Sequence, residues 1–425
     1  MKKLKAEIWD KVQYIFRNYY DRMIHCASYY EGKVDISALR KSLYYIVEKY
    51  PILHSSFNSS AINPSWSVNE EFSEEEMASA VYCEDLKKSV LASLAEEISY
   101  KAKLQFKMTA HYCSNNSAIT LIVNHMCMDG ADFKYLIGKI VEGYNIIVNG
   151  GDISTLELKS GERGVDQLYE DMSEEDAKTA RSLMKNVSRT GIKNKFDFTD
   201  DEDCETTFHL RKLDESFVTS LKSKGKEYDA TLNDVFVSAY ARAISQYLEK
   251  SDDKRIAITC MKNLRDHINS HQSESLTNLT GFMPCVLDSV DGSFEQTLSA
   301  VCEKTKLAKE DEFCGLYGLP LMALAFKIFP YSIAEFAIKI GYENPLIGMS
   351  NIGIISEEAI SAQGLKCVDA FMTGATKFKP YIQLTSTTFK GETTLCIAQK
   401  CSVEDSKRIN ALLDSIIDEL KSFVE

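Results

Sequence analysis

Segments with the patterns of β-strands and of amphipathic helices alternate irregularly along this chain, and this alternation restricts the folds open to it. The helix predicted over 35–50 opens on Asp35, a common N-cap residue, and Pro51 follows its end. The pattern predicts an α/β (α+β) fold in which mixed β-sheets are flanked by helices. In the first half we predict strands at 21–30, 52–57, 106–113 and 118–124, and further helices at 89–100 and 131–148.

The second half shows the same alternation of strand and helix patterns, after a stretch of weak periodicity. Between 149 and 205, Asp, Glu, Lys and Gly accumulate without an apolar period. A chain of 425 residues also exceeds what one hydrophobic core usually organises. We therefore predict an N-terminal domain over 1–160, a crossover linker over 161–205 and a C-terminal domain over 206–425. The second half is predicted to contain strands at 206–213, 255–261, 282–287, 346–355, 365–372, 381–387 and 392–398, and helices at 214–224, from 231 and at 403–424.

The composition narrows the classes of partner. The formal net charge is −13, and no basic stripe with interleaved aromatic residues is visible, so a nucleic-acid partner is not expected. In so acidic a protein, any coenzyme phosphate needs a local cationic patch.

Three features favour a cytoplasmic protein without a transmembrane segment. The first ten residues lack the apolar core of a signal peptide. The most apolar stretch, 316–340, is interrupted by charged residues and Pro330, and predicts two amphipathic helices that meet near Phe329. The 12 cysteines are scattered, with no CxxC pair or His-rich segment, which predicts reduced thiols and no metal site.

One short string, 124–130, contains the side chains best suited to chemistry. His125 follows an apolar run and can accept a proton near neutral pH. Asp129 can orient this histidine or brace the backbone, and Gly130 permits a turn. The same letters also fit a histidine at a strand end, followed by an Asp-Gly turn that caps the next helix.

The wider sequence carries a resemblance that favours the first interpretation. The chain resembles the chloramphenicol acetyltransferase-like superfamily, specifically its condensation-domain and alcohol-acyltransferase branch, which includes polyketide-associated acyltransferases and wax-ester synthases. Asn124 stands where the family has the first histidine of its signature, and the DFGWG segment of plant acyltransferases has no counterpart. The matching segments are 50–57 (HPxLR), 124–130 (HHxxxDG), 230–234 (ATxND), 261–265 (vxLR), 279–282 (GNxxG-like) and 349–353 (xSNxG).

The resemblance implies two similar domains arranged as a V, with the active site in a tunnel at their interface. It implies that His125 is the general base, and that Asp129 has a structural role through an ion pair with Arg265, next to Gly130. Candidate donors to the developing oxyanion are the side chains of Ser350, Asn351, Thr385 and Ser386.

By the same resemblance, we expect an acyltransferase that moves an acyl group from a thioester to a hydroxyl or amine on a small-molecule or lipid-like acceptor. Acyl-CoA or a phosphopantetheine thioester serves as co-substrate, and no cofactor is bound permanently. Two alternatives stay open. One is a stand-alone peptide-forming condensation protein that acts in trans with acyl or peptidyl carrier proteins, and the other is a non-catalytic docking member of the fold.

Overall fold

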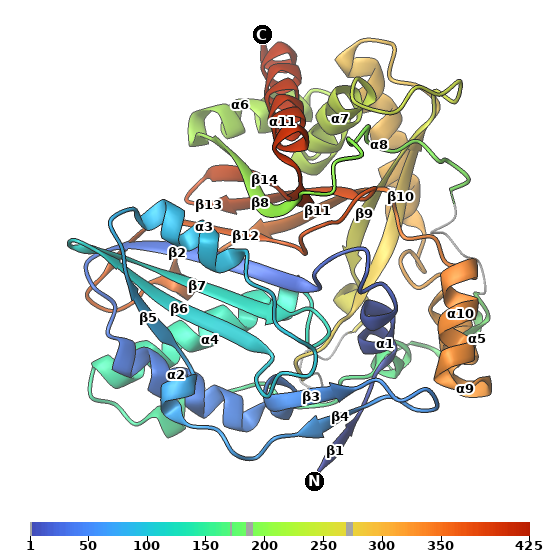
Figure 1. The fold of residues 1–425 in the computed structure, drawn as a ribbon. Helices are drawn as coiled ribbons and strands as arrows, with labels where there is room; N and C mark the ends of the chain where they lie inside the picture. The colour runs from blue at the N-terminus through green and yellow to red at the C-terminus, as the bar shows by residue number, and fades with distance from the viewer. Residues whose placement is uncertain (1, 171, 184–189, 269–274) are drawn as a thin grey trace.

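The computed structural model describes residues 2–170, 172–183, 190–268 and 275–425, which form two lobes, each built on a large mixed sheet (Figure 1). The five-stranded sheet has the order β12-β2-β7-β6-β5, and its pairs are antiparallel except β5 with β6. Its strands are β2 (Met23–Glu31), β5 (Ser79–Tyr82), β6 (Phe106–Cys113), β7 (Asn116–Asn124) and β12 (Lys366–Thr373).

Helices cover both faces of the five-stranded sheet because its strands are apolar on both sides. On one face lie α2 (Ile36–Lys49) and α4 (Gly130–Val148), and on the other lies α3 (Leu86–Leu94) (Figure 1). Along β2, Ile24 and Cys26 belong to the core under α2 and α4, whereas Ala27 packs in the core under α3.

The six-stranded sheet of the second lobe has the order β10-β9-β11-β13-β14-β8. Strand β11 runs parallel to β9 and β13, and the other pairs are antiparallel. Four helices pack on its outer face and bury the second core (Figure 1). These elements are β8 (Glu205–Leu213), α6 (Glu215–Lys226), α7 (Leu232–Ser245), β9 (Ile256–Asn263), β10 (Thr280–Leu287), α8 (Phe294–Glu310), β11 (Ile347–Ile354), β13 (Ile382–Phe389), β14 (Glu392–Cys401) and α11 (Val403–Val424).

Smaller elements lie outside the two large sheets. A three-stranded antiparallel sheet has the order β1-β4-β3 and lies near α1. The apolar stretch 316–340 forms two helices that break at Phe329 and Pro330, as predicted. The bounds are β1 (Lys3–Lys5), α1 (Ile8–Ile15), β3 (Ser55–Asn58), β4 (Ser65–Val68), α5 (Glu174–Ser182), α9 (Leu319–Ile328) and α10 (Tyr331–Gly341). No helix among the described residues is long and apolar enough to cross a bilayer.

The two lobes are joined by one strand that crosses from the second half of the chain to the first sheet, and by a shared apolar core. Strand β12 comes from the second half of the chain but pairs with β2 along the edge of the first sheet. Phe371 on β12 and Met23 on β2 pack in one apolar cluster with Phe208 of β8 and Ala398 of β14. The predicted fold class is confirmed, and the domain boundaries at 160 and 205 stay predictions.

One predicted strand is wrong in its first part. Residues Pro51–His54 form a 3-10 helix, and β3 begins only at Ser55. The proline fixes its own φ at a value suited to a helical turn, and the Ser55 hydroxyl donates to the Pro51 carbonyl oxygen at 2.6 Å. The helix predicted at 89–100 instead spans α3, because Asp85 caps it by accepting from the Lys88 backbone N–H at 2.9 Å.

Candidate active site

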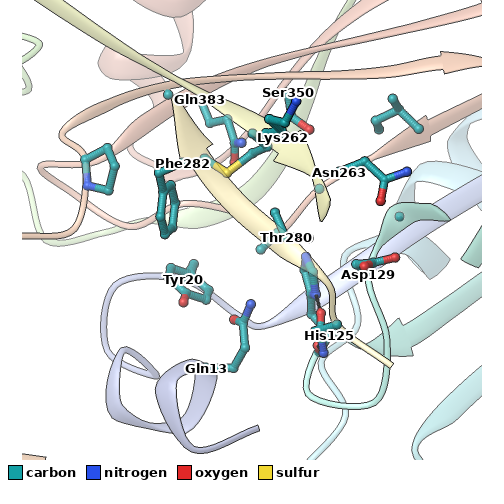
Figure 2. Close-up of a pocket in the computed structure, with 18 of the residues that line it drawn as sticks. Gln13, Tyr20, His125, Asp129, Lys262, Asn263, Thr280, Phe282, Ser350 and Gln383 are labelled. Atoms are coloured by element: carbon teal, nitrogen blue, oxygen red, sulfur yellow. Dashed lines mark hydrogen bonds between the residues drawn. The ribbon is translucent and has the colours of Figure 1, made fainter. Parts of the chain in front are cut away.

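A cavity of about 230 Å³ lies between the lobes, and both contribute to its wall. The end of β7 and helix α1 form one side, and the strands of the six-stranded sheet form the other (Figure 2). The polar residues that line it include Gln13, Tyr20, His125, Lys134, Lys262, Asn263, Asn278, Thr280, Ser350, Asn351, Lys377 and Gln383.

The loop that follows β7 places His125 in this cavity. The His125 backbone N–H donates to the Arg22 carbonyl oxygen at 2.7 Å, and Arg22 holds a left-handed conformation with φ of 60°. Asn124, the departure from the family signature, is buried and faces the loop. Its Nδ2 donates to Gln105 Oε1 at 2.7 Å, and its Oδ1 accepts from the Met126 backbone N–H at 3.1 Å. Asn124 therefore braces the loop without lining the cavity.

Asn278 determines which nitrogen of His125 carries the proton. Asn278 Nδ2 donates to the His125 carbonyl oxygen at 2.8 Å, so Oδ1 is the atom that lies 3.1 Å from His125 Nδ1. An amide oxygen only accepts, and Nδ1 must therefore be the protonated nitrogen. Nε2 keeps its lone pair and has no hydrogen-bond partner among the described residues, so it is available to a substrate in the cavity.

The electrostatic surroundings keep this imidazole neutral. Burial lowers the pKa of His125, and the positive charge of Lys377 lowers it further. The His125 backbone carbonyl, Asp129 and Asn278 act in the opposite direction, but the pKa stays below its usual value of 6.5. A neutral imidazole at pH 7 is the form that a general base needs.

Asp129 is fully engaged in structural contacts. Its Oδ1 accepts from the backbone N–H groups of Ala131 and Asp132 at 3.0 and 3.1 Å, which caps α4. Its Oδ2 accepts from Arg265 Nη1 and the Leu279 backbone N–H, both at 2.7 Å. Burial favours the neutral acid, but Arg265 and the backbone donors outweigh it and hold the pKa of Asp129 below its usual value. The carboxylate thus ties the start of α4 to the second half of the chain.

Arg265 also contacts a second buried carboxylate. Its Nη2 lies 3.0 Å from Asp132 Oδ2, which also accepts from the Thr277 backbone N–H at 2.6 Å, and Lys159 Nζ pairs with Asp132 Oδ1. Burial and the charge of Asp129 raise the pKa of Asp132 to about 6. One arginine therefore connects two carboxylates at the N-terminus of α4.

Arg163 supports the loop from the other side. Its guanidinium makes a two-pronged contact with Asp10, with both N–O distances at 3.1 Å. Its Nη2 also donates to the Cys127 carbonyl oxygen at 3.1 Å, and its Nε donates to the Leu276 carbonyl oxygen at 2.8 Å. These contacts hold the backbone of the loop next to His125.

Only two of the four side chains predicted to donate a hydrogen bond to the oxyanion line the cavity. Ser350 and Asn351 of β11 line it, as does Gly130 at the start of α4. Thr385 lies deep between the sheets, where its hydroxyl donates to the Cys396 carbonyl oxygen at 3.0 Å. Ser386 is also fully buried, and neither residue is part of the cavity wall. No cluster of three or more His, Cys, Asp or Glu suited to a metal ion occurs within the described ranges.

The sequence interpretation missed Asn278, Arg163 and Asp132. Asp132 stood three residues after Asp129 in the helix start, and Asn278 directly precedes the 279–282 segment that matched the family. The helix start and the family-matching segment could therefore have pointed to Asp132 and Asn278. Arg163 lies in the stretch of weak periodicity, where no pattern marked it.

One family model matches the larger part of this chain. The family model of the condensation domain matches residues 13–319, which include His125, Asp129, Arg265 and Asn278. The chain belongs to the condensation-domain family. No sequence among curated proteins matches the chain.

Solved structures share the whole fold at low sequence identity. Polyketide synthase associated protein 5 from Mycobacterium tuberculosis is 14% identical with a TM-score of 0.71, covering 100% of this chain and 97% of that one. The trichothecene 15-O-acetyltransferase TRI3 from Fusarium sporotrichioides is 10% identical with a TM-score of 0.71, covering 99% and 95%. The first condensation domain of the CDA synthetase is 12% identical with a TM-score of 0.70, covering 100% and 97%. The chain therefore has the fold shared by condensation domains and acyltransferases, which confirms the resemblance.

Proposed function

We propose that this protein transfers an acyl group from a thioester to a hydroxyl or amine, with His125 as the general base. The observation that carries the proposal is the state of the imidazole. Asn278 keeps Nδ1 protonated, burial keeps the ring neutral, and Nε2 is left free at a cavity between two lobes. Membership of the condensation-domain family supports the same chemistry.

The reaction needs one proton acceptor and one oxyanion donor. As the acceptor oxygen or nitrogen attacks the thioester carbonyl carbon, Nε2 takes its proton. The tetrahedral intermediate then collapses, the C–S bond breaks, and the imidazolium returns the proton to the leaving thiolate. The Ser350 hydroxyl and the Asn351 amide, both on the cavity wall, are the side chains suited to the oxyanion. Because the cavity holds both substrates together, no covalent enzyme intermediate is required.

The thioester donor is acyl-CoA or a phosphopantetheine arm on a carrier protein. Both present the same sulfur and carbonyl to His125, so one assay covers both sources. Membership of the condensation-domain family supports the carrier-bound donor. The full-length structural likeness to an O-acetyltransferase keeps acyl-CoA as the second possible donor.

Release of free thiol tests the proposal. Purified protein is incubated with acyl-CoA or acyl-carrier thioesters and with hydroxyl and amine acceptors, and free thiol and acylated product are measured. His125→Ala should reduce the rate by about 100- to 10,000-fold, the usual effect of removing a general base. His267→Ala is the matched control, since His267 is half-buried, lies outside the cavity wall and should leave the rate unchanged. Transfer that survives in His125→Ala would overturn the mechanism.

A further inference from the structure

The cavity gathers positive charge in a protein whose formal net charge is −13. Three lysines line it, namely Lys134, Lys262 and Lys377. Lys134 Nζ donates to the Ile352 carbonyl oxygen at 2.7 Å, and Lys262 Nζ lies 3.5 Å from Asp266 Oδ2. Nζ of Lys377 has neither a hydrogen bond nor an ion pair with any described residue. One ammonium group is therefore available to a ligand.

Two hydrogen bonds to β14 hold the backbone of Lys377. The Lys377 N–H donates to the Ala398 carbonyl oxygen at 3.0 Å, and the Lys377 carbonyl oxygen accepts from the Lys400 N–H at 2.9 Å. Nζ lies 4.4 Å from the centre of the Tyr20 ring, which also lines the cavity (Figure 2). The ring face attracts the cation but neutralises none of its charge.

The acidic residue whose charge acts on Lys377 is Asp21, and its carboxylate is already occupied. Asp21 Oδ1 accepts from the backbone N–H groups of Met23 and Thr376 at 2.9 and 3.0 Å, and Oδ2 lies 3.6 Å from His25 Nε2. Burial raises the pKa of Asp21 to about 7, so near neutral pH it is a weak counter-ion. Burial also lowers the pKa of Lys377 to about 8, which leaves this group mostly charged at pH 7. A desolvated, unpaired ammonium is unfavourable, and an anionic ligand relieves that cost.

We infer that Lys377 binds a carboxylate of the acceptor, so that the acceptor is an amino acid or a hydroxy acid. This inference rests on the proposed function. Lys377 and His125 line the same cavity of about 230 Å³, so an anion bound to Lys377 shares this cavity with the reacting hydroxyl or amine. The phosphate of CoA or of a carrier protein is separated from the thioester by the whole pantetheine arm. A carboxylate within a few bonds of the nucleophile fits this position, and a donor phosphate does not.

Matched acceptors and variants test the inference. An amino acid and a hydroxy acid are each compared with their own carboxamides in the thiol-release assay, using wild type, Lys377→Met and Lys262→Met. Wild type should favour the acid by about 10- to 100-fold in kcat/KM, as expected for one charge-assisted hydrogen bond. Lys377→Met should remove this preference, so that the acid and its amide are used with equal kcat/KM. Lys262→Met, which changes a lysine of the same wall that already has an acidic neighbour, should keep the preference. Lys377→Gln replaces Lys377→Met if the latter does not fold.

Two further measurements separate the alternatives. Calorimetric binding of the same acid and amide pairs works without turnover, and the acid should bind wild type at least tenfold more tightly than it binds Lys377→Met. Equal binding overturns the inference, even when thiol release depends on His125 and the proposed function stands. Comparison of acyl-CoA with acyl-pantetheine, which has no phosphate, tests the other anion. If Lys377→Met weakens only the use of acyl-CoA, the bound group is the phosphate and the carboxylate assignment is wrong.

Discussion

At the scale of single residues, the chemistry depends on the tautomer and the charge of His125. Asn278 acts as a positioning residue, because its amide bridges Nδ1 and the carbonyl oxygen of the same histidine. Asn124 has a different task, since its side chain links Gln105 to the Met126 backbone. The residue that departs from the family signature therefore contributes to the shape of the loop rather than to proton transfer.

Removal of the Asn278 amide should impair turnover more than binding. In Asn278→Ala the imidazole loses the acceptor that fixes Nδ1–H, so the ring samples the wrong tautomer and orientation. We expect kcat to fall by up to about 100-fold with little change in KM. Asn344→Ala, which changes another asparagine of the cavity wall without a bond to His125, is the control and should keep kcat. A rise in KM with kcat unchanged would show that Asn278 only binds substrate.

At the scale of elements, local signals in the sequence predicted most helices and strands. Asp35 caps α2 as expected, and the capping box between Thr231 and Asp234 opens α7. The strand predicted at 52–57 was wrong in its first part because apolar residues after a proline fit a strand and a 3-10 turn equally well. Contacts such as His125 with Asn278 span 153 residues, and no local pattern specifies which distant amide reaches a given ring.

The cap of α4 has more than a local role, which a stability measurement can show. Asp129→Ala removes one of the two carboxylates that Arg265 contacts, and leaves the Leu279 N–H buried without its acceptor. Breaking a buried ion pair in this way should lower the free energy of unfolding by about 3–5 kcal/mol. Asp85→Ala removes a helix cap without an ion pair and should cost about 1 kcal/mol. Equal losses in denaturant titrations of the two variants would contradict the structural role of Asp129.

At the scale of the whole molecule, the site exists because the two halves of the chain interlock. Strand β12 crosses to the first sheet, and the segment that follows it brings Lys377 to the cavity beside the loop after β7. His125 comes from the first half, whereas Asn278 and Lys377, which influence its protonation, come from the second. The alternation of elements predicted two similar halves. The crossing of β12 has no signal in the sequence, because the residue pattern of an edge strand is the same whichever sheet it joins.

The protonation state of His125 is the central claim, and nitrogen NMR of histidine-labelled protein measures it directly. Comparison of wild type with His125→Ala assigns the signal of this residue, and a pH titration then gives its pKa and its tautomer. Because burial and the Lys377 charge disfavour the imidazolium, the account predicts a midpoint below pH 6.5, with Nδ1 protonated and Nε2 unprotonated at pH 7. A midpoint above pH 6.5, or a proton on Nε2 in the neutral ring, would contradict it.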